Sequence, residues 1–489
     1  MNSLKSIEQI RAFIPSYIYE VGDVLNSAGY KAYLVGGAVR NILLGLEPKD
    51  FDIATDALPE QVEKIFPRSV GIYAKFGTVL VIMQSNTGER FDVEVTTFRK
   101  EENYYGGRWP ADVKFTDDLY VDLSRRDFTV NAFAIDLNVI NKSNAIEGEV
   151  VIDYFDGKVD LENKVIRAVG KPIDRFTEDG LRSFRACRLA SVYGFTIEEA
   201  TFRAIHDTLH VSKIVSMERI RDEFLKTIYN SAKPSYGIEL LRESGLLEIF
   251  MPELLDTIGI VQPIFHSDDL YTHSLKALDI AEDSVKIAAL LHDIGKTKTK
   301  IEDAKGIHFY GHDVVGAEMT DMILTRMRLP KSEVKRNVTL VRWHMFFYPS
   351  AQWRKEYADE DEVESVDGGG WTDAAVRRFV QKVGEDMIED LFKLRIADAT
   401  ANPKMGFDQN ELQVFSDRIS DVRSKDMVLK VKDLDIDGDD LMAIGVNPGP
   451  EMGNILNALL ELVIDDTGMN KKELLLNSAK DIIQKGKSH

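Results

Sequence analysis

The strand-like segments of this chain lie within its first third, whereas helical periodicity runs from about residue 175 to the C-terminus. Three of them, at 49–55 (KDFDIAT), 77–84 (GTVLVIMQ) and 90–98 (RFDVEVTTF), alternate in polarity or run apolar with β-branched residues, so we expect them in one sheet. Residues 3–28 have the periodicity of one amphipathic helix, and the apolar run at 30–39 stops at two glycines before a short helix. The pattern predicts an α+β N-terminal region followed by all-α regions.

A chain of 489 residues is long enough for three or four domains of roughly 150 residues each. Its formal net charge of −20 argues against a uniformly basic nucleic-acid coat and against an electrostatic membrane binder, but it leaves room for a local basic groove. The single cysteine, Cys187, excludes an internal disulfide and a multi-cysteine metal site. No window approaches 18 consecutive apolar residues, so we expect a cytoplasmic protein that does not enter a membrane.

A glycine pair and two nearby aspartates form the first candidate site. Gly36 and Gly37 stand between the apolar run and the short helix, where backbone N–H groups at a helix N-terminus leave room for a phosphate. Asp50 and Asp52 share one face of the next strand, and carboxylates this close repel each other unless a cation such as Mg²⁺ lies between them. Glu94 on the 90–98 strand is a candidate third carboxylate. The alternative for an isolated Asp-x-Asp pair is a solvated strand face.

The string at 35–55 (VGGAVRNILLGLEPKDFDIAT) resembles the class II tRNA nucleotidyltransferases, which are the CCA-adding enzymes and bacterial poly(A) polymerases of the polymerase-β-type superfamily. Further blocks resemble that family in the same order: EVTTFR (94–99), NYYGGRWPADVKF (103–115), SRRDFTVNAFAID (124–136) and EDGLRSFRACRLASVYGFTI (178–197). A fifth block at 436–456 resembles its tail segment. Several ordered blocks are far more specific than any one motif.

The resemblance implies that CTP and ATP are the substrates and that tRNA receives their nucleotides at its 3′ end, with Mg²⁺ held by Asp50 and Asp52 and with Glu94 as a third catalytic residue. Asp179 would accept a hydrogen bond from an exocyclic amine and Arg182 would donate to ring acceptors, so that side chains select C and A in place of a template. The other nucleotide-binding residues that it implies are Gly36, Gly37, Arg40, Arg126, Asp127, Asn131, Arg185 and Arg188, and a flexible loop contributes Tyr104 and Arg108. We expect a monomer or a homodimer.

Two positions depart from the family pattern. Asn41 stands where relatives commonly carry aspartate, and Gly106 stands where their flexible loop commonly carries aspartate. That loop is thought in the family to help the change from C to A addition, so an enzyme that adds only A, or only CC, stays an alternative. A poly(A) polymerase is another alternative, although processive adenylation of many RNAs favours a strongly basic chain.

Six of the nine histidines lie between positions 266 and 344, in the helical part of the chain. Four of them, with two aspartates, form the ligand set of a divalent metal that activates water: His273, His292, Asp293, His312, His344 and Asp398. Their order resembles an HD phosphohydrolase domain, which implies a metal such as Ni²⁺, Mn²⁺ or Fe²⁺ at His273, His292, Asp293 and Asp398 and a second one near His312 and His344. His266 and His308 are expected on the surface. An alternative of another class makes this domain the working part and the N-terminal region an RNA-binding module.

The two resemblances together imply an elongated multidomain chain with a polymerase-β-like head, which is a mixed sheet with helices. We expect the nucleotidyltransferase head at 1–145, a helical neck with the nucleotide-selecting helices at 146–215, a helical RNA-binding body at 216–262, the HD domain at 263–405 and a tRNA-binding tail at 406–489.

Overall fold

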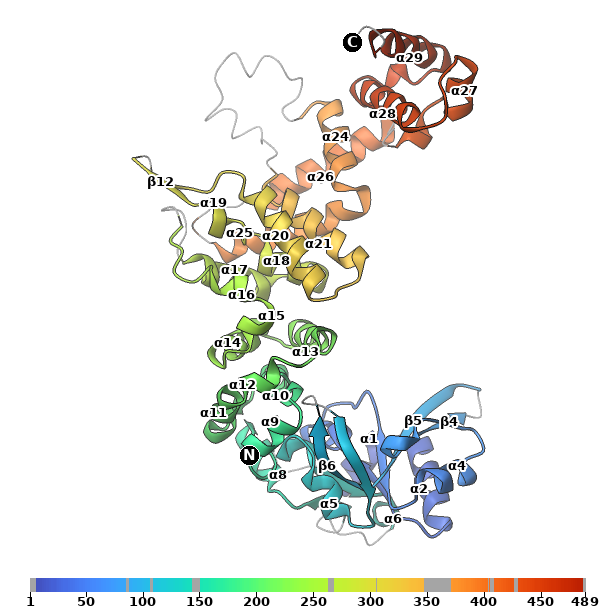
Figure 1. Ribbon diagram of the computed structural model, residues 1–489, viewed down its shortest axis with the longest axis vertical. Coiled ribbons are helices and arrows are strands. Elements are labelled where there is room, and N and C mark those ends of the chain that lie inside the picture. The colour runs from blue at the N-terminus through green and yellow to red at the C-terminus, as the bar shows by residue number, and fades with distance from the viewer. Residues whose placement is uncertain are drawn as a thin grey trace. The chain divides into compact units, whose positions relative to one another are not determined.

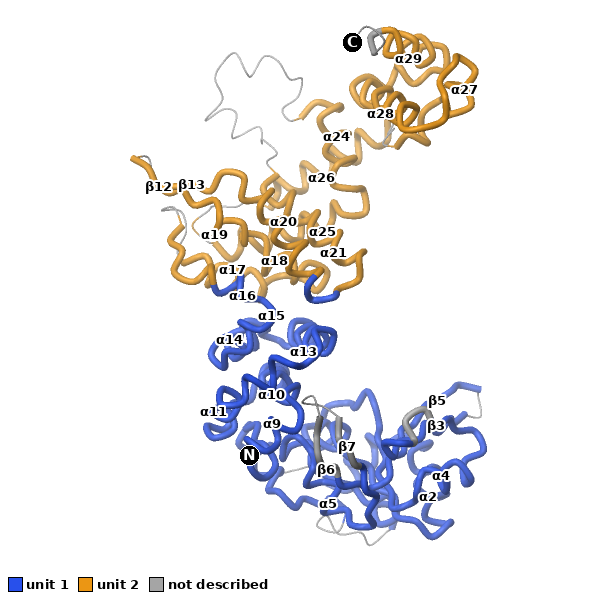
Figure 2. The backbone as a smooth tube through the Cα atoms, in the orientation of Figure 1, with its two compact units in different colours: residues 1–255, 326–328 blue, residues 256–325, 329–489 orange. Residues whose placement is uncertain are grey.

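The computed structural model describes residues 6–84, 88–105, 109–142, 150–262, 268–304, 306–346, 371–402, 404, 409–425 and 430–486. The chain divides into two compact units, one of residues 1–255 with 326–328 and the other of residues 256–325 with 329–489 (Figure 2). Within these ranges, no helix is long and apolar enough to cross a membrane.

A seven-stranded mixed sheet forms the centre of the first unit (Figure 1). Its strands follow the order β3 (Ser69–Tyr73), β4 (Thr78–Gln84), β5 (Arg90–Thr97), β2 (Asp52–Thr55), β1 (Ala32–Val35), β8 (Phe133–Asp136) and β9 (Val151–Asp153). Neighbouring strands run antiparallel, except that β2 and β5 run parallel. The three strands expected from the sequence are β2, β4 and β5, and they are neighbours, so the predicted mixed-sheet head is confirmed.

The central strands are apolar because they are buried. Leu34 of β1, Ile53 of β2 and Val95 of β5 have no solvent contact. Strand β2 begins at Asp52, three residues after the start of the predicted strand at 49–55. A polar residue is tolerated there because the start of a strand is less buried than its middle. Asp50 therefore lies on the loop that enters β2, and Asp52 is its first residue.

The helix predicted at 3–28 is wrong as a single element. The first helix, α1 (Ile7–Phe13), ends before Pro15, and α2 (Ser16–Ser27) begins after it. Proline lacks a backbone N–H and disfavours helical geometry in the preceding residue, and Ile14 is extended with ψ 117°. The periodicity of 3–28 comes from two consecutive helices.

The remaining elements of the first unit are two strand pairs and a series of helices. The pairs are antiparallel β6 (Arg99–Tyr105) with β7 (Trp109–Phe115), and parallel β10 (Val165–Ile166) with β11 (Thr196–Ile197). The helices are α3 (Gly37–Leu44), α4 (Pro59–Ile65), α5 (Leu119–Ser124), α6 (Leu137–Ile140), α8 (Gly157–Asn163), α9 (Pro172–Glu178), α10 (Leu181–Tyr193), α11 (Glu199–Asp207), α12 (Leu209–Ser212), α13 (Met217–Asn230), α14 (Pro234–Glu243), α15 (Leu247–Phe250) and α16 (Pro252–Leu255).

The second unit is helical in its described residues, apart from the hairpin of β12 (Ile301–Asp303) and β13 (Gly306–His308). Its helices are α17 (Leu270–Ile280), α18 (Lys286–Leu291), α19 (Lys296–Thr299), α20 (His312–Arg326), α21 (Lys331–Trp343), α24 (Asp373–Val383), α25 (Ile388–Ala401), α26 (Gln409–Lys425), α27 (Gly438–Ala443), α28 (Pro450–Asp465) and α29 (Lys472–Gly486). The last three share a core of their own around Leu441, Leu459 and Leu475. The predicted helical character of the C-terminal part is confirmed.

Candidate active site and metal cluster

A cavity of about 820 Å³ in the first unit brings together residues from α3, the loop before β2, the segment after α5 and helices α10 and α13. Its lining includes many of the residues singled out in the sequence: Gly36, Gly37, Arg40, Asn41, Asp50, Asp52, Arg126, Asp127, Asn131, Arg185 and Arg188. The lining also includes Tyr193, which lies in the 178–197 block but was not singled out there, and Tyr229 and Asn230, which no sequence motif indicated.

The carboxylates lie at the edge of this cavity on adjacent strands. Asp52 is paired in register with Glu94 across the parallel β2–β5 ladder, so the two side chains share one face of the sheet. Asp50, Asp52 and Glu94 all contact solvent. The pKa of Asp52 is raised to about 6 by partial burial and by the charge of Glu94. A raised carboxyl pKa beside other carboxylates is the electrostatic signature of a position that favours a cation.

The turn before α3 requires glycine. Gly36 has a φ of 75°, in the left-handed region that L side chains rarely adopt. A Cβ atom there would also lie 2.9 Å from the Nη1 atom of Arg126. Arg126 is a cation close to the carboxylates, since its charge counteracts the rise in the pKa of Asp52. Its Nε atom is buried without a hydrogen-bond partner in the described part of the chain.

Asp127 is the centre of a buried polar network. Its carboxylate accepts hydrogen bonds from Asn131 Nδ2 (3.0 Å) and Arg185 Nε (2.8 Å) and forms an ion pair with Arg185 Nη2 (2.6 Å). Burial by itself would raise the pKa of Asp127, but the charge of Arg185 and the hydrogen bond from Asn131 outweigh it and hold the pKa well below its usual range. The carboxylate is therefore a permanently ionised acceptor.

Asn41 has a defined role despite its departure from the aspartate of relatives. Its amide oxygen accepts hydrogen bonds from Arg40 Nη2 and Tyr193 Oη, each at 2.9 Å, and the Arg40 guanidinium lies 4.5 Å from the centre of the Tyr193 ring. Arg40 also hydrogen-bonds Asn131. An amide oxygen provides the acceptor that a carboxylate would provide, with one less negative charge in the cavity.

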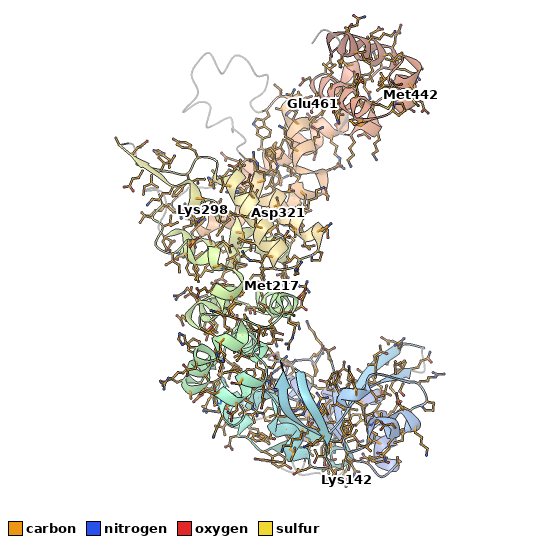
Figure 3. The ribbon with its side chains drawn as sticks, viewed as in Figure 1. Lys142, Met217, Lys298, Asp321, Met442 and Glu461 are labelled. Atoms are coloured by element: carbon orange, nitrogen blue, oxygen red, sulfur yellow. The ribbon has the colours of Figure 1, made fainter. Side chains whose placement is uncertain are left out.

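Asp179 and Arg182 do not line this cavity and have protein partners. Asp179 Oδ2 forms an ion pair with Arg219 Nη2 at 2.7 Å, and Arg182 Nη1 forms one with Glu178 Oε2 at 2.5 Å. Arg219 lies on α13, the helix that begins at the labelled Met217 (Figure 3). Arg219 and Asp179 are 40 residues apart in the chain, so no local sequence pattern predicts their ion pair. Glu178 is the last residue of α9 and Arg182 lies in α10, with Asp179 extended between the two helices, so this pair is not the contact of neighbouring turns within one helix.

The flexible loop predicted around residues 103–115 is described only in part. Tyr104 lies in β6, opposite Pro110 of β7, and its side chain is not described. Arg108 and Gly106 lie outside the described residues.

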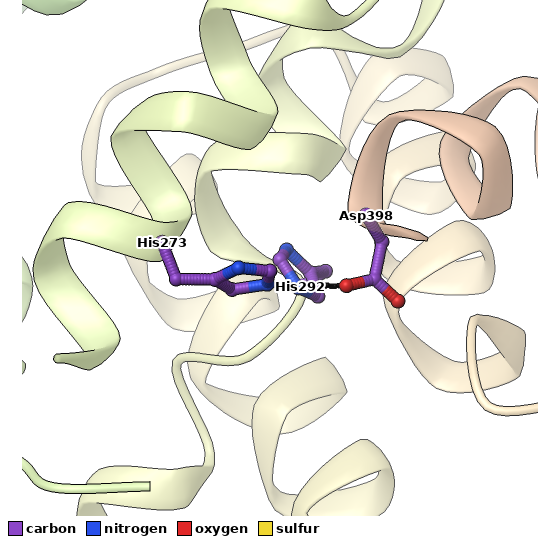
Figure 4. A group of neighbouring side chains, drawn as sticks. All are labelled: His273, His292 and Asp398. Carbon is purple, nitrogen blue, oxygen red and sulfur yellow. Dashed lines mark hydrogen bonds and ion pairs between the residues drawn. The ribbon is translucent and has the colours of Figure 1, made fainter. Parts of the chain in front are cut away.

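In the second unit, the six predicted metal-ligating residues lie together in the interior, although they come from three helices and from the C-terminal ends of two more. They form two groups of three, His273 with His292 and Asp398, and Asp293 with His312 and His344. In the first group (Figure 4), His273 Nε2 lies 3.2 Å from His292 Nε2 and 3.1 Å from Asp398 Oδ1.

Asp293 connects the two groups. Its Oδ2 atom lies 3.3 Å from His292 Nε2, and its Oδ1 atom lies 3.4 Å from His312 Nε2 and 3.6 Å from His344 Nε2. Lys296 Nζ also contacts Oδ2 at 2.6 Å. A carboxylate with one oxygen toward each group has the geometry to bridge two cations.

Backbone hydrogen bonds orient three of the imidazoles. The Nδ1 atoms of His292, His312 and His344 lie 2.8, 2.8 and 2.6 Å from the carbonyl oxygens of Ala289, Phe309 and Val341. A carbonyl only accepts, so each Nδ1 carries a proton, and the nitrogen that each ring turns toward the interior is Nε2. The Nε2 atoms of His312 and His344 are buried without a hydrogen-bond partner in the described chain.

The electrostatics of this cluster also favour positive charge. Burial by itself would lower the pKa of His292, but the charge of Asp293 raises it to about 10. Burial would raise the pKa of Asp398, but hydrogen bonds from His273 and His292 hold it well below its usual range.

Of the two histidines expected on the surface, His308 is partly exposed and lies 3.3 Å from Asp303, and His266 lies outside the described residues.

Four family models match parts of the chain. Residues 32–167 match the Poly A polymerase head domain, residues 194–257 the probable RNA and SrmB-binding site of polymerase A, residues 269–402 the HD domain, and residues 382–479 the putative tRNA nucleotidyltransferase domain 2. Both catalytic domain types imply dependence on a divalent metal.

Curated relatives match almost the whole chain. A CCA-adding enzyme of Lactococcus lactis subsp. cremoris (strain SK11) is 30% identical over 460 residues, which is 94% of each chain. A CCA-adding enzyme of Pediococcus pentosaceus is 32% identical over 459 residues, 94% of this chain and 96% of its own. The crystal structure of the Bacillus stearothermophilus CCA-adding enzyme in complex with CTP has the same fold, with a TM-score of 0.63 at 24% identity over 96% of this chain and 98% of that one.

Proposed function

The chain belongs to the family of CCA-adding enzymes, and from that premise we propose that it adds C, C and A to the 3′ end of tRNA from CTP and ATP. The observation that carries this proposal for the chain itself is the single cavity that contains the glycine turn, Asp50 and Asp52, and the arginines of α10. The turn and the arginines suit a triphosphate, and the carboxylates suit the cation that accompanies it. Mg²⁺ is the cation that we propose.

The carboxylates fit Mg²⁺ by their donor chemistry. Asp50, Asp52 and Glu94 offer hard oxygen atoms in contact with solvent, and the raised pKa of Asp52 reflects a repulsion that a cation would relieve. Bound there, Mg²⁺ would supply neutralisation of the triphosphate charge and activation of the attacking hydroxyl. Asp50 and Asp52 would hold it, with Glu94 as the third catalytic carboxylate. Arg126, with its unpartnered Nε atom, would bind a phosphate.

The ribose and the base would be recognised by residues farther along the chain. Asp127, permanently ionised and oriented by Asn131 and Arg185, would accept a hydrogen bond from a ribose hydroxyl. Arg40 and Arg188 would complete the nucleotide site, to which Tyr104 and Arg108 of the loop predicted from the sequence would contribute. Asp179 and Arg182 would read the base, with the Arg219 ion pair positioning Asp179.

We propose the domain limits predicted from the sequence for the same reasons: a head at 1–145, a neck at 146–215, a body at 216–262, an HD domain at 263–405 and a tail at 406–489. The family models for the head and the HD domain support the first and fourth of these. The tRNA partner would contact the neck, body and tail, and the enzyme would act as a monomer or a homodimer.

The test uses tRNA transcripts that end at the discriminator base, at C and at CC, each incubated with Mg²⁺ and with CTP or ATP alone or together. Growth to CCA followed by arrest is the expected result. Addition of A only to the CC-ended transcript would identify an A-adding enzyme, and arrest at CC a CC-adding one. A long A tail on any RNA would identify a poly(A) polymerase and contradict the proposal.

We also propose metal-dependent phosphohydrolase activity for the second unit. The orphaned Nε2 atoms of His312 and His344 and the bridging position of Asp293 favour it, because imidazole and carboxylate together suit Ni²⁺, Mn²⁺ or Fe²⁺. Bound there, such a metal would supply a Lewis acid. The reaction joins a water oxygen to phosphorus, breaks the ester P–O bond and transfers a proton to the departing alcohol. Equilibrium dialysis against each metal, followed by release of phosphate from glycerol 2-phosphate, tests it, and a chain that binds none would contradict it.

A further inference from the structure

Arg40 is a buried cation of the head cavity, and its hydrogen-bond partners in the described part of the chain are all neutral. It is 8% exposed. Its Nε and Nη2 atoms donate to Asn41 Oδ1 at 3.2 and 2.9 Å, Nη2 also donates to Tyr193 Oη at 2.6 Å, and Nη1 donates to Asn131. A buried arginine is usually paired with a carboxylate. Position 41 is where relatives commonly carry one, so this chain holds the guanidinium by other means.

Tyr193 contacts the Arg40 guanidinium both through its hydroxyl and through its ring. The hydroxyl accepts from Arg40 Nη2 and, because a carbonyl oxygen only accepts, it donates to Asn41 Oδ1 at 2.9 Å. The centre of the ring lies 4.5 Å from the guanidinium carbon, which is the distance of a cation–π contact. Tyr193 is the last residue of α10, whereas Arg40 and Asn41 lie on α3. The tyrosine therefore joins two helices that are far apart in the sequence.

The same guanidinium orients the residue proposed to recognise the ribose. Arg40 Nη1 donates to the amide oxygen of Asn131, which turns the Nδ2 atom of that amide toward Asp127 Oδ1 at 3.0 Å. Arg185 contacts the other carboxylate oxygen of Asp127. A chain of hydrogen bonds therefore connects Tyr193 to Asp127 through two intermediate side chains. A shift of the guanidinium would free the amide to rotate and would change the direction in which Asp127 accepts.

We propose that Tyr193 is a positioning residue for ribose recognition: it fixes Arg40 beside an uncharged residue 41, and through Arg40 it holds Asp127 toward the ribose. The inference rests on the nucleotide addition proposed above and concerns the selection of ribonucleotides. The four hydrogen bonds of Arg40 leave one of the five N–H groups of a guanidinium for a ligand, so its effect on the nucleotide passes mainly through its protein partners. The 2′-hydroxyl is the group that separates a ribonucleotide from a deoxyribonucleotide.

The test compares CTP with 2′-deoxyCTP as substrates for the first addition to discriminator-ended tRNA, by the full chain with Mg²⁺, as the ratio of their kcat/KM values. Tyr193→Phe keeps the ring and removes the hydroxyl, so it should lower kcat/KM about tenfold for CTP and less than about twofold for 2′-deoxyCTP. Asn41→Asp returns a carboxylate to Arg40. In that background Tyr193→Phe should lower the ratio less than about threefold, because an ion pair then holds the guanidinium without the tyrosine hydroxyl.

Tyr236→Phe is the matched control, because the Tyr236 hydroxyl donates to the carbonyl oxygen of Phe195 at 3.0 Å and does not line the cavity, so the ratio should stay within about twofold of wild type. Equal losses for both nucleotides in Tyr193→Phe, or no loss for either, would overturn the inference and leave the proposed function intact. An effect of Tyr193→Phe as large in the Asn41→Asp background as in wild type would overturn it too. A wild-type chain that adds no C would overturn the proposed function and, with it, the inference.

Discussion

Both candidate sites contain carboxylates that suit a cation, but those of the head are exposed to solvent and those of the second unit are buried. In the head, Asp50 and Asp52 face an open cavity, whereas in the second unit Asp293 and Asp398 are buried. The buried charges of the head are paired among themselves, as Asp127 is with Arg185, but the buried histidines His312 and His344 keep free lone pairs. Solvated ligands release a cation easily, whereas buried ligands without other partners hold one. If both sites hold metals as proposed, the difference predicts a cation that exchanges readily in the head and one that is held more firmly in the second unit.

The largest effect should come from the exposed carboxylates. Asp52→Ala removes the proposed Mg²⁺ ligand, so nucleotide addition should fall by more than about 1,000-fold in a primer-extension assay with CC-ended tRNA. The metal content of the second unit, measured by mass spectrometry after desalting, should not change. Addition that survives this substitution would break the assignment of the first site.

The next effect should appear only in the second unit. Asp293→Ala removes the carboxylate between the two groups of ligands, so metal retained after desalting should fall at least about fivefold, while nucleotide addition should stay within about twofold of wild type. Asp321→Asn, an exposed acid on α20 (labelled in Figure 3), is the control. Equal loss of metal in both variants would show that the cluster does not hold it.

A smaller effect concerns the ion pairs in the head. Arg219 holds Asp179 at 2.7 Å, so Arg219→Ala should leave Asp179 misplaced and reduce the preference for CTP over UTP about tenfold, with a smaller change in total turnover. Arg219→Lys keeps the charge and should restore part of the preference. Arg203→Ala removes an exposed ion pair with Glu199 and should not alter the preference. An unchanged CTP to UTP ratio would leave Arg219 with a purely structural role.

The smallest effect is a pH dependence of stability. The Asp52 pKa is about 6 in the folded chain against an ordinary value near 3.8, so its ionised form is disfavoured by folding. That penalty is absent below about pH 4, grows as the pH rises through 6 and is constant above about pH 7. In metal-free protein at pH 8, Asp52→Asn should therefore stabilise the head by about 1 kcal/mol, after allowance for solvent contact, and should have no effect at pH 4. Thermal denaturation at the two pH values checks this, and a gain that is equal at both would contradict it.

Local sequence patterns predicted a strand or a helix well where the residues of that one segment determine its structure. The apolar runs of β2, β4 and β5 were sufficient to indicate one sheet, whereas its mixed character followed from the family resemblance. The ordered histidines and aspartates were sufficient to indicate residues that the fold brings together, because each carries its own chemical identity. Partnerships between distant residues were not predictable: nothing near Asp179 indicates Arg219, and nothing near Asn41 indicates Tyr193. These depend on how α10 and α13 pack, which no short segment determines. Pro15 could have predicted the break between α1 and α2, but the helical periodicity continues on both sides of it and favoured a single helix.

The backbone bonds of the cluster histidines bear on how the site assembles. Each of His292, His312 and His344 donates to a carbonyl three residues earlier, so the contact that fixes the proton on Nδ1 lies within one turn of backbone. The bond fixes which ring nitrogen turns toward the interior through a contact that is local in the chain. Metal binding would then displace the Nε2 proton that the raised pKa of His292 retains in the metal-free cluster.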